Sequence, residues 1–355
     1  MSYEKNIRKC VPYTPGEQPQ RKVIKLNTNE CPYPPSPAVE KVLHEFDAEA
    51  LRRYPDPVCE ELVHSIAKYY GLKDDQVFVG VGSDDVLSMC FLTFFAGDKP
   101  VIFPDITYSF YDVWADVYRI PYEQIPLKKD FSLDPEDYIG RENGGVVIAN
   151  PNAPTGVLES LDTIERIVKA NPESIVIVDE AYIDFGGETA IPLISKYDNV
   201  IITRTMSKSR ALAGLRVGYA FGDAKAIKYL NDVKFSVNSY TMNMPALAAG
   251  KAAIEDDEYF KEITSRVIAT REWTKEQLKA LGFTFRDSMT NFIFASSPAV
   301  LERDGSMKLI FEGLKKNDIF VRFFDKPTLK NYLRISIGTD EEMQKFIETL
   351  RSMLP

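Results

Sequence analysis

The feature that most constrains the fold is a series of short apolar runs, rich in Val, Ile and Phe, that alternate with amphipathic stretches. The runs occupy residues 77–80, 100–103, 145–149, 174–179, 199–203 and 217–221. Near-continuous apolar runs of this length, separated by helical patterns, are typical of buried, mostly parallel strands with helices on both faces of the sheet. The sequence therefore predicts a large α/β domain.

The chain on either side of these runs has a different pattern. Residues 1–35 are rich in Pro, Asn and Gln, which predicts an extended N-terminal arm that packs on another part of the protein. Beyond the runs, a long charged helix over roughly 255–281 is followed by short apolar segments and further helices, which is typical of a smaller α+β domain. We therefore expect an arm at 1–35, a large domain at 36–245 and a small domain at 246–355.

Composition and charge narrow the class of partner. The 355 residues carry a net charge of −9 without a block of like charge, so there is no electrostatic reason to expect a nucleic acid or an acidic membrane as the partner. A small-molecule partner is expected instead. The N-terminus has no apolar leader-like region, and no run of about 18 apolar residues could span a bilayer. We therefore expect a cytoplasmic protein.

Histidine and cysteine are too sparse and too scattered for several kinds of catalytic site. The two histidines, His44 and His64, lie in helical patterns without a neighbouring cluster of Cys or carboxylates, and the four cysteines lack the paired spacing of metal ligands. The sequence therefore predicts neither a metal site nor a Ser-His-Asp triad. In a chain of this length the cysteines are expected to be reduced thiols in ordinary packing.

Polar residues follow three consecutive predicted strands at similar spacing. Asn152, Asp179 and Lys208 are separated by 27 and 29 residues, about one strand and one helix each. Because ligands in open α/β sheets bind at the carboxyl ends of strands, we expect the three side chains to share one site. Taken alone, each has an ordinary alternative, namely a tight turn, a structural ion pair and a solvated surface charge. A neighbouring cation, Arg216, would lower the pKa of the Lys208 amine and make it a better nucleophile toward a carbonyl.

The stretch VGVGSDD, residues 79–85, is a candidate anion site. Gly80 and Gly82 follow a predicted strand and Ser83 opens a predicted helix, so free backbone N–H groups could face a phosphate there. A capped turn without a ligand is the alternative, because the third glycine of a dinucleotide fingerprint is missing. Tyr182, three residues after Asp179, could direct its hydroxyl at the same crevice.

Eight segments of the chain, in their order and spacing, resemble those of the fold type I, aspartate-aminotransferase-like family of enzymes that use pyridoxal 5′-phosphate (PLP). They are KLNTNECPYPPSP, RRYPDP, VGVGSDDVL, TYSFY, NPNAPTG, VDEAY, TMSKSRALAGLRVGYA and NYLRISIGT. Within that family they are most similar to the histidinol-phosphate aminotransferases. The resemblance implies the PLP-dependent transferase fold, with a large mostly parallel-sheet domain and a smaller α+β domain, and it implies PLP as the cofactor.

The resemblance also assigns cofactor contacts to residues of this chain. Lys208 would form the covalent bond to the cofactor's aldehyde, and Asp179 would pair with the protonated ring nitrogen. Asn152 and Tyr182 would hydrogen-bond to the phenolic oxygen, and Tyr108 would stack on the ring. The residues assigned to the cofactor phosphate are Ser83, Asp84, Thr205, Ser207 and Arg216.

Subunit and substrate contacts are implied in the same way. Tyr54 would reach the cofactor phosphate of the other subunit, which makes the expected assembly a homodimer. Arg334 would bind the carboxylate of an amino acid, and Arg322 would bind the phosphate of the substrate. Tyr13 and Asn29, in the N-terminal arm, would close the same pocket.

The implied reaction transfers the amino group of L-histidinol phosphate to 2-oxoglutarate, giving imidazole-acetol phosphate and L-glutamate in histidine biosynthesis. Two related activities, a threonine-phosphate decarboxylase and an aromatic amino-acid aminotransferase, are the alternatives within the family. A ligand-sensing regulator would need a DNA-binding segment, and the arm has no helix-turn-helix pattern. Cys31 stands where an asparagine is common in the family. This difference puts the contacts of the arm in doubt, but it affects no residue that is assigned an electronic role at the cofactor.

Overall fold

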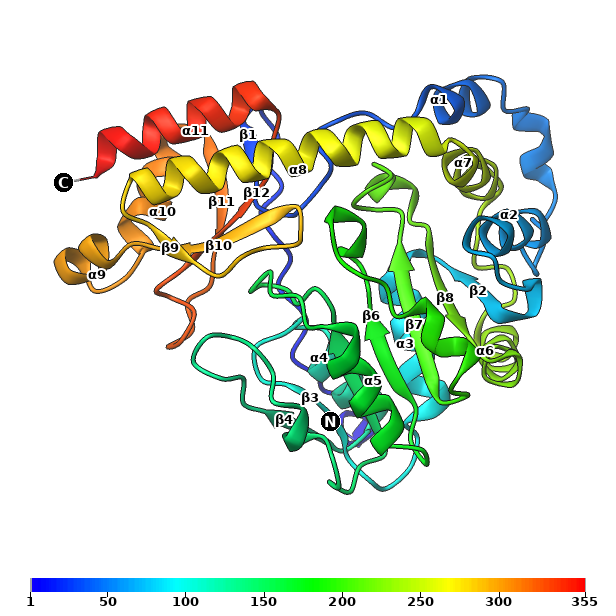
Figure 1. The fold of residues 1–355 in the computed structure, drawn as a ribbon. Coiled ribbons are helices and arrows are strands. Elements are labelled where there is room, and N and C mark those ends of the chain that lie inside the picture. Colours follow the sequence, from blue (N-terminus) through cyan, green and yellow to red (C-terminus); the bar gives the residue numbers. More distant parts are fainter. Residues whose placement is uncertain (1, 355) are drawn as a thin grey trace.

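The predicted apolar runs form six strands of one large sheet in the computed structural model, which describes residues 2–354 (Figure 1). The strands of this sheet are β2 (Val77–Gly80), β3 (Val101–Pro104), β4 (Tyr122–Ile125), β5 (Gly145–Ala149), β6 (Val176–Asp179), β7 (Val200–Thr205) and β8 (Gly218–Gly222). Their order is β2-β8-β7-β6-β5-β3-β4, and the pairings are parallel except for those of β8. The predicted mostly parallel sheet is confirmed. Strand β4 was not predicted, because its sequence YEQI lies at the sheet edge and has no apolar run.

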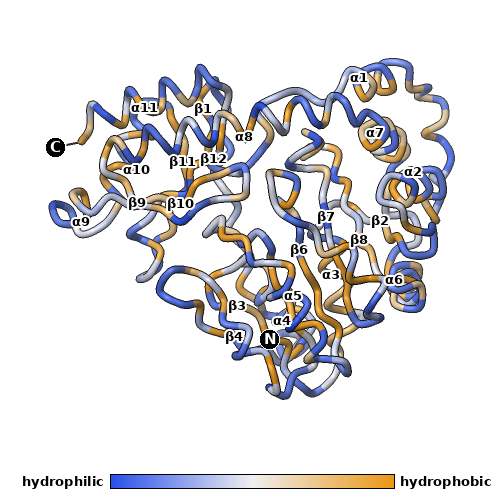
Figure 2. The backbone as a smooth tube through the Cα atoms, in the orientation of Figure 1, coloured by the Kyte–Doolittle hydropathy of each residue, from blue (hydrophilic) through white to orange (hydrophobic). Residues whose placement is uncertain are grey.

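Helices cover both faces of this sheet, because side chains on successive strand positions point to opposite faces. Val146 and Ile148 pack in one core with α1, α2, α5 and α7, whereas Val147 and Ile177 pack in another core with α3, α4 and α6. These helices are α1 (Pro37–His44), α2 (Glu60–Tyr70), α3 (Gly82–Phe94), α4 (Tyr111–Tyr118), α5 (Leu161–Ala170), α6 (Ala224–Val237) and α7 (Met244–Glu255). Figure 2 shows hydrophobic residues concentrated along the strands that they enclose.

A second, smaller sheet is formed mainly by the C-terminal part of the chain. Its order is β1-β11-β12-β10-β9, and its elements are β1 (Ile24–Leu26), β9 (Thr284–Phe285), β10 (Phe292–Ser296), β11 (Ile319–Phe323) and β12 (Leu333–Ser336). The accompanying helices are α8 (Asp257–Ala280), α9 (Pro298–Asp304), α10 (Lys308–Lys316) and α11 (Asp340–Met353). The smaller α+β unit that the sequence predicted is therefore present.

Two segments connect the large and small units. The N-terminal arm contributes β1, which pairs in parallel with β11 from Ile24 opposite Ile319 to Leu26 opposite Val321. Helix α7 packs its apolar side, including Ile254, in the core of the large sheet, and α8, which follows it directly, packs in the core of the small unit. The domain limits of 1–35, 36–245 and 246–355 stay a prediction.

The carboxyl ends of β5, β6 and β7 lie side by side and define where a ligand site can form. Ala149 of β5 is in register with Asp179 of β6, which in turn is in register with Thr203 of β7. The loops that follow these strands carry Asn152 and Lys208. The sheet therefore places the three predicted residues at one edge.

The remaining elements are short. They are the 3₁₀ helices Ser2–Asn6, Ala48–Arg52, Asp74–Gln76, Pro135–Asp137, Ile183–Phe185, Ile191–Ser195 and Ala213–Leu215. Within residues 2–354, none of the helices combines the length and the apolar character needed to cross a membrane.

Candidate active site

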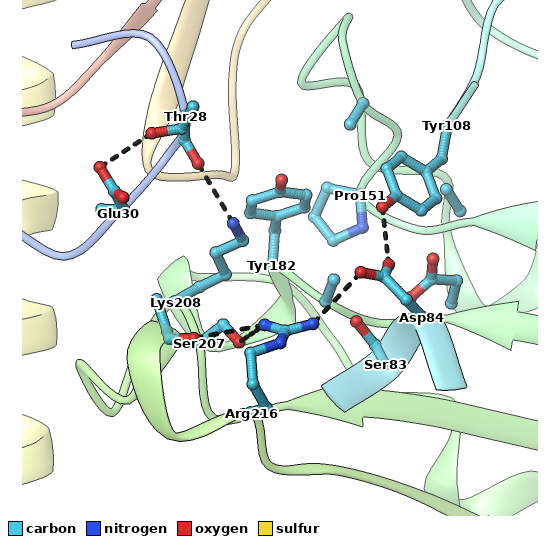
Figure 3. A pocket seen from close by; sticks show the side chains of 15 residues that line it. Thr28, Glu30, Ser83, Asp84, Tyr108, Pro151, Tyr182, Ser207, Lys208 and Arg216 are labelled. Atoms are coloured by element: carbon cyan, nitrogen blue, oxygen red, sulfur yellow. Dashed lines mark hydrogen bonds and ion pairs between the residues drawn. The ribbon is translucent and has the colours of Figure 1, made fainter. Parts of the chain in front are cut away.

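A cavity of about 260 Å³ lies where the loops after β5, β6 and β7 meet the start of α3 and the N-terminal arm (Figure 3). The predicted residues that line it are Ser83, Asp84, Tyr108, Asp179, Tyr182, Ser207, Lys208 and Arg216. A concave cavity in which a few polar groups converge is typical of a small-ligand site. The structure therefore brings these side chains together around one space.

The Lys208 side chain is half-buried and its amine faces this cavity, where no carboxylate within residues 2–354 is hydrogen-bonded to it. Its Nζ donates a hydrogen bond to the carbonyl oxygen of Thr28 at 3.3 Å and lies 5.9 Å from the centre of the Tyr182 ring. Burial lowers the pKa of Lys208 to about 8, and the positive charges of Arg334 and Arg216 act in the same direction. About a tenth of the amine is therefore neutral, and nucleophilic, at pH 7, far more than for an exposed lysine.

Asp179 ends β6 with its carboxylate facing the cavity and only 5% of its surface exposed. Its Oδ2 accepts a hydrogen bond from the Tyr111 hydroxyl at 2.9 Å, and its Oδ1 accepts one from Thr203 Oγ1 at 3.2 Å. Burial raises the pKa of Asp179 to about 6, although the two hydroxyl groups act in the opposite direction. A cation or a protonated ring nitrogen in the cavity would stabilise the ionised form.

The start of α3 and Arg216 form a pocket suited to an anion. The first N–H groups of a helix have no partner within the helix, and those of Ser83 and Asp84 lie in the first turn of α3. Arg216 reaches the same place, where its Nη2 is 3.2 Å from Asp84 Oδ2 and its Nη1 is 3.4 Å from Ser207 Oγ. Thr205 stands behind this pocket and donates to Ser207 Oγ at 2.9 Å.

Two glycines allow this close approach. An added Cβ at Gly218 in β8 would lie 2.3 Å from the carbonyl carbon of Gly82 and 2.4 Å from the amide nitrogen of Ser83. At Gly82, where φ is +81°, an added Cβ would lie 2.4 Å from Arg216 Nη2. The backbone of α3 and the guanidinium can therefore meet only because both positions lack a side chain.

Two tyrosines place aromatic rings and hydroxyls at the cavity. Tyr108 donates from its hydroxyl to Asp84 Oδ1 at 2.7 Å, and the Tyr182 hydroxyl accepts from Asn29 Nδ2 at 2.9 Å. Burial raises the pKa of both hydroxyl groups, so both are protonated at neutral pH. The bond to Tyr182 also connects the arm to the loop after β6.

The structure places Asn152 beside the cavity with its amide turned to its own loop and to the segment that follows β3. Its Nδ2 donates to the carbonyl oxygen of Ile106 at 2.9 Å and to Thr155 Oγ1 at 3.0 Å, and its Oδ1 accepts from Thr107 Oγ1 at 2.8 Å. The neighbouring Pro151 lines the cavity instead. In this arrangement the amide of Asn152 holds the loop in place, and its predicted bond to a ligand stays a prediction.

Two further predicted residues, both arginines, are not among the residues that line the cavity within residues 2–354, and they lie next to each other on adjacent strands. Arg322 of β11 and Arg334 of β12 are in register across the antiparallel pair. Arg334 Nη2 donates to the carbonyl oxygen of Asn27 at 2.9 Å, and its buried Nε has no hydrogen-bond partner within residues 2–354. Arg322 donates to the carbonyl oxygens of Thr14 at 3.1 Å and Pro15 at 3.4 Å. Because the acceptors of these bonds are neutral carbonyl oxygens, the bonds leave the positive charge of both guanidinium groups in place.

The other two predicted aromatic residues do not line the cavity of their own chain, as far as residues 2–354 show. Tyr13 stacks on Phe110 with a distance of 4.3 Å between ring centres. Tyr54 is 77% exposed and stacks on Tyr240 at 4.5 Å. Tyr54 is therefore accessible to another molecule rather than directed at its own site.

Four residues of the site were missed in the sequence. Thr28 and Glu30 line the cavity from the arm, and the charge of Glu30 acts on Lys208. Tyr111 and Thr203 hold Asp179. Thr203 could have been found, because it ends a predicted strand next to the one that carries Asp179. In residues 2–354, no group of three or more His, Cys, Asp or Glu side chains could hold a metal ion.

The arrangement of a buried amine, a buried carboxylate and an anion pocket at the carboxyl edge of this sheet defines a PLP-dependent enzyme of the aspartate-aminotransferase type. The family model of the class I and II aminotransferases matches residues 21–350, and the chain belongs to that family. It is 48% identical to the histidinol-phosphate aminotransferase of Lactococcus lactis subsp. cremoris (strain SK11), over 100% of this chain and 98% of that protein. It is 52% identical to the histidinol-phosphate aminotransferase of Marinomonas sp. (strain MWYL1), over 96% of each chain.

A solved structure gives the same result for the fold. The histidinol-phosphate aminotransferase of Sinorhizobium meliloti, in complex with pyridoxal-5′-phosphate, is 26% identical and superimposes with a TM-score of 0.83 over 94% of this chain and 92% of that one. The predicted fold, the predicted class of enzyme and the predicted cofactor are thereby confirmed. The partners of such an enzyme are small molecules, as the composition led us to expect.

Proposed function

We propose that the chain transfers the amino group of L-histidinol phosphate to 2-oxoglutarate, giving imidazole-acetol phosphate and L-glutamate, a step of histidine biosynthesis. The relatives named above support this substrate, because they are similar over the full length of the chain. The structural observation that carries the proposal is the pair formed by Arg322 and Arg334 on adjacent strands of the small sheet, where the charge of Arg334 acts on Lys208. Two neighbouring cations suit substrates that bring a phosphate or two carboxylates.

The residues of the cavity fit PLP. When bound, this cofactor supplies an aldehyde that takes up an amine and a protonated ring that accepts the electron pair of a broken bond at Cα. Lys208 would hold the aldehyde, and the buried Asp179 would hold the ring nitrogen. The ring would lie against Tyr108, with Asn152 and Tyr182 near its phenolic oxygen. The groups for its phosphate are Ser83, Asp84, Thr205, Ser207 and Arg216.

Lys208 is also the group that would move the proton. With the cofactor and the substrate bound, Nζ would take the proton from the substrate Cα as a base and give it back as an acid. A pKa of about 8 allows the amine to act as base and its conjugate acid to act as acid at neutral pH. Its hydrogen bond to the carbonyl oxygen of Thr28 restricts where the amine points.

The two arginines would divide the anionic groups between them. Arg334 is half-buried, with its guanidinium 5.4 and 5.6 Å from the ring centres of Phe292 and Phe324, and would take the carboxylate of the oxo-acid through its free, buried Nε. Arg322 lies nearer the surface and would take the substrate phosphate. Tyr13 and Asn29 would close the site from the arm, where Asn29 already bonds to Tyr182.

One parallel assay tests the proposed reaction. Purified enzyme with PLP is given histidinol phosphate and 2-oxoglutarate, threonine phosphate alone, or phenylalanine and 2-oxoglutarate, and both glutamate and carbon dioxide are measured. We expect glutamate formation to be fastest with histidinol phosphate. Carbon dioxide without glutamate from threonine phosphate would contradict the transaminase assignment, and a preference for phenylalanine would replace the proposed substrate.

The proposed assembly is a homodimer in which Tyr54 completes the site of the partner subunit. The exposure of Tyr54 supports this role. Mixing inactive Lys208→Ala subunits with Tyr54→Ala subunits should restore activity, because one site of each mixed dimer then has both residues. Mixtures no more active than their components, with mixed dimers shown by mass spectrometry, would exclude it. A biosynthetic enzyme of this kind also suits the cytoplasm, which cell fractionation would test.

A further inference from the structure

The Asp179 carboxylate is held by two hydroxyl groups from different elements. The hydroxyl of Tyr111, the first residue of α4, donates to Oδ2 at 2.9 Å, and Thr203 Oγ1, in β7, donates to Oδ1 at 3.2 Å. Each carboxylate oxygen can accept more than one hydrogen bond, so both oxygens keep capacity for a donor in the cavity. The two bonds therefore fix the direction of the carboxylate without saturating it.

Neither hydroxyl is needed to fill space. Tyr111 is fully buried, and its ring packs on Phe103 and Phe91 with centroid distances of 5.7 and 6.2 Å, contacts that a phenylalanine would keep. Thr203 is fully buried as well, and a valine has the same shape. A buried hydroxyl is unfavourable unless it is hydrogen-bonded, and Asp179 is the partner that the structure shows for each of them.

The two hydroxyls also act on the charge of Asp179. Burial and the nearby Asp84 raise the pKa of this carboxyl, whereas hydrogen bonds from Tyr111 and Thr203 lower it. Loss of either bond would favour the protonated acid. A neutral acid stabilises a protonated ring nitrogen less than a carboxylate does.

We propose that Tyr111 and Thr203 are positioning residues, whose hydroxyls hold the Asp179 carboxylate, ionised, toward the ring nitrogen of the cofactor. This inference rests on the proposed function, in which PLP occupies the cavity with its ring nitrogen at Asp179. Among the described residues, neither of the two lines the cavity. They therefore act through Asp179 and not on the cofactor directly.

The test compares PLP with an analogue in which the ring nitrogen is replaced by C–H, using the full-length apoenzyme and dissociation constants from absorbance titration. Tyr111→Phe and Thr203→Val should each weaken PLP binding about tenfold and leave binding of the carbon analogue within about twofold of the wild type. Thr203→Ser keeps the hydroxyl and should bind PLP like the wild type. Tyr118→Phe is the matched control, because it removes a hydroxyl of the same helix that bonds to Ser88 at 2.5 Å.

Equal losses for PLP and for the carbon analogue would show that the hydroxyls matter only for packing, and would overturn the proposal. Variants that bind PLP as tightly as the wild type would overturn it too. If Tyr111→Phe does not fold, as judged by circular dichroism, the pair Thr203→Val and Thr203→Ser gives the same decision. If the wild type binds PLP and the carbon analogue equally well, both this proposal and the role of Asp179 are contradicted. The transamination assay tests the proposed function independently.

Discussion

The two sides of the cavity hold their charged groups in different ways. On the sheet side, Asp179 accepts from two hydroxyls and Arg216 pairs with the Asp84 carboxylate, although Arg216 also donates to a backbone carbonyl. On the arm side, the cations Arg322 and Arg334 donate to backbone carbonyls. A carbonyl satisfies a donor but leaves its charge in place. We therefore expect the sheet side to hold a group that stays bound and the arm side to bind anions that come and go.

Removal of the reacting amine should have the largest effect. Lys208→Ala is expected to lower kcat by at least about 10³-fold, because the variant lacks both the nucleophile and the base. Borohydride should fix the chromophore onto Lys208 of the wild type, as peptide mapping would show. Lys228→Ala, in which an exposed lysine of α6 is removed, should behave like the wild type. A colourless Lys208→Ala variant that still turns over would refute the assignment.

Removal of Arg334 should weaken substrate binding without weakening cofactor binding. Arg334→Ala is expected to raise KM for 2-oxoglutarate about 100-fold, because a buried charge-assisted pair is lost. The affinity for PLP, measured by titration of the apoenzyme, should stay within about twofold. An equal loss of cofactor affinity would mean that the arm side is not a separate substrate side.

The pH dependence of cofactor attachment tests the environment of Lys208. Its pKa is lowered to about 8, and only the neutral amine attacks the aldehyde, so the rate of attachment should rise with pH and level off above 8. Between pH 6 and pH 8 the neutral fraction grows about fiftyfold. Stopped-flow absorbance of apoenzyme mixed with PLP measures this rate. A rate that keeps rising beyond pH 10, as for an exposed lysine, would be inconsistent with a buried amine.

The second arginine should have a smaller and more selective effect. Arg322→Ala is expected to raise KM for histidinol phosphate about tenfold. This effect is smaller than that of Arg334→Ala, because Arg322 lies nearer the solvent. The KM for 2-oxoglutarate should change little, which makes Arg322→Ala and Arg334→Ala controls for each other in steady-state assays. Equal effects of both variants on both substrates would show that the arginines do not divide the anionic groups.

The smallest effect on activity is expected for a change in the sheet. Gly218→Ala would push the start of α3 away from β8, and should destabilise the protein by about 1–3 kcal/mol and weaken PLP binding less than about tenfold. Gly214→Ala is the control, since no other atom of the described chain lies within 4 Å of its added Cβ. Urea unfolding and cofactor titration would measure both effects. A variant as stable as the wild type would show that α3 can shift without cost.

Much of the sheet side could be predicted from the sequence, and little of the arm side. Asp179 follows an apolar run directly and Lys208 lies five residues after the next one, so strand order alone brought them together. Tyr111 could not be assigned to Asp179, because the two are 68 positions apart on different elements. Thr28 acts through its carbonyl oxygen, and no side chain reveals such a partner.

The fold shows the same limit. Strands with long apolar runs were predicted, whereas β4 and β1 were not. Strand β4 is half exposed at an edge, so it lacks the apolar pattern. Strand β1 has only three residues and depends on β11, almost 300 positions later in the chain, for its pairing. Segments whose stability comes from distant partners carry no local signal that identifies them.

The short link between β1 and the reacting lysine has a mechanical consequence. Strand β1 ends at Leu26, Asn27 gives its carbonyl to Arg334, and Thr28 gives its carbonyl to Lys208. Three adjacent residues thus join the small sheet, the Arg334 guanidinium and the Lys208 amine. Any displacement of this span would therefore change the hydrogen bonds of Arg334 and Lys208 together, so the backbone of the arm fixes the two cations relative to each other.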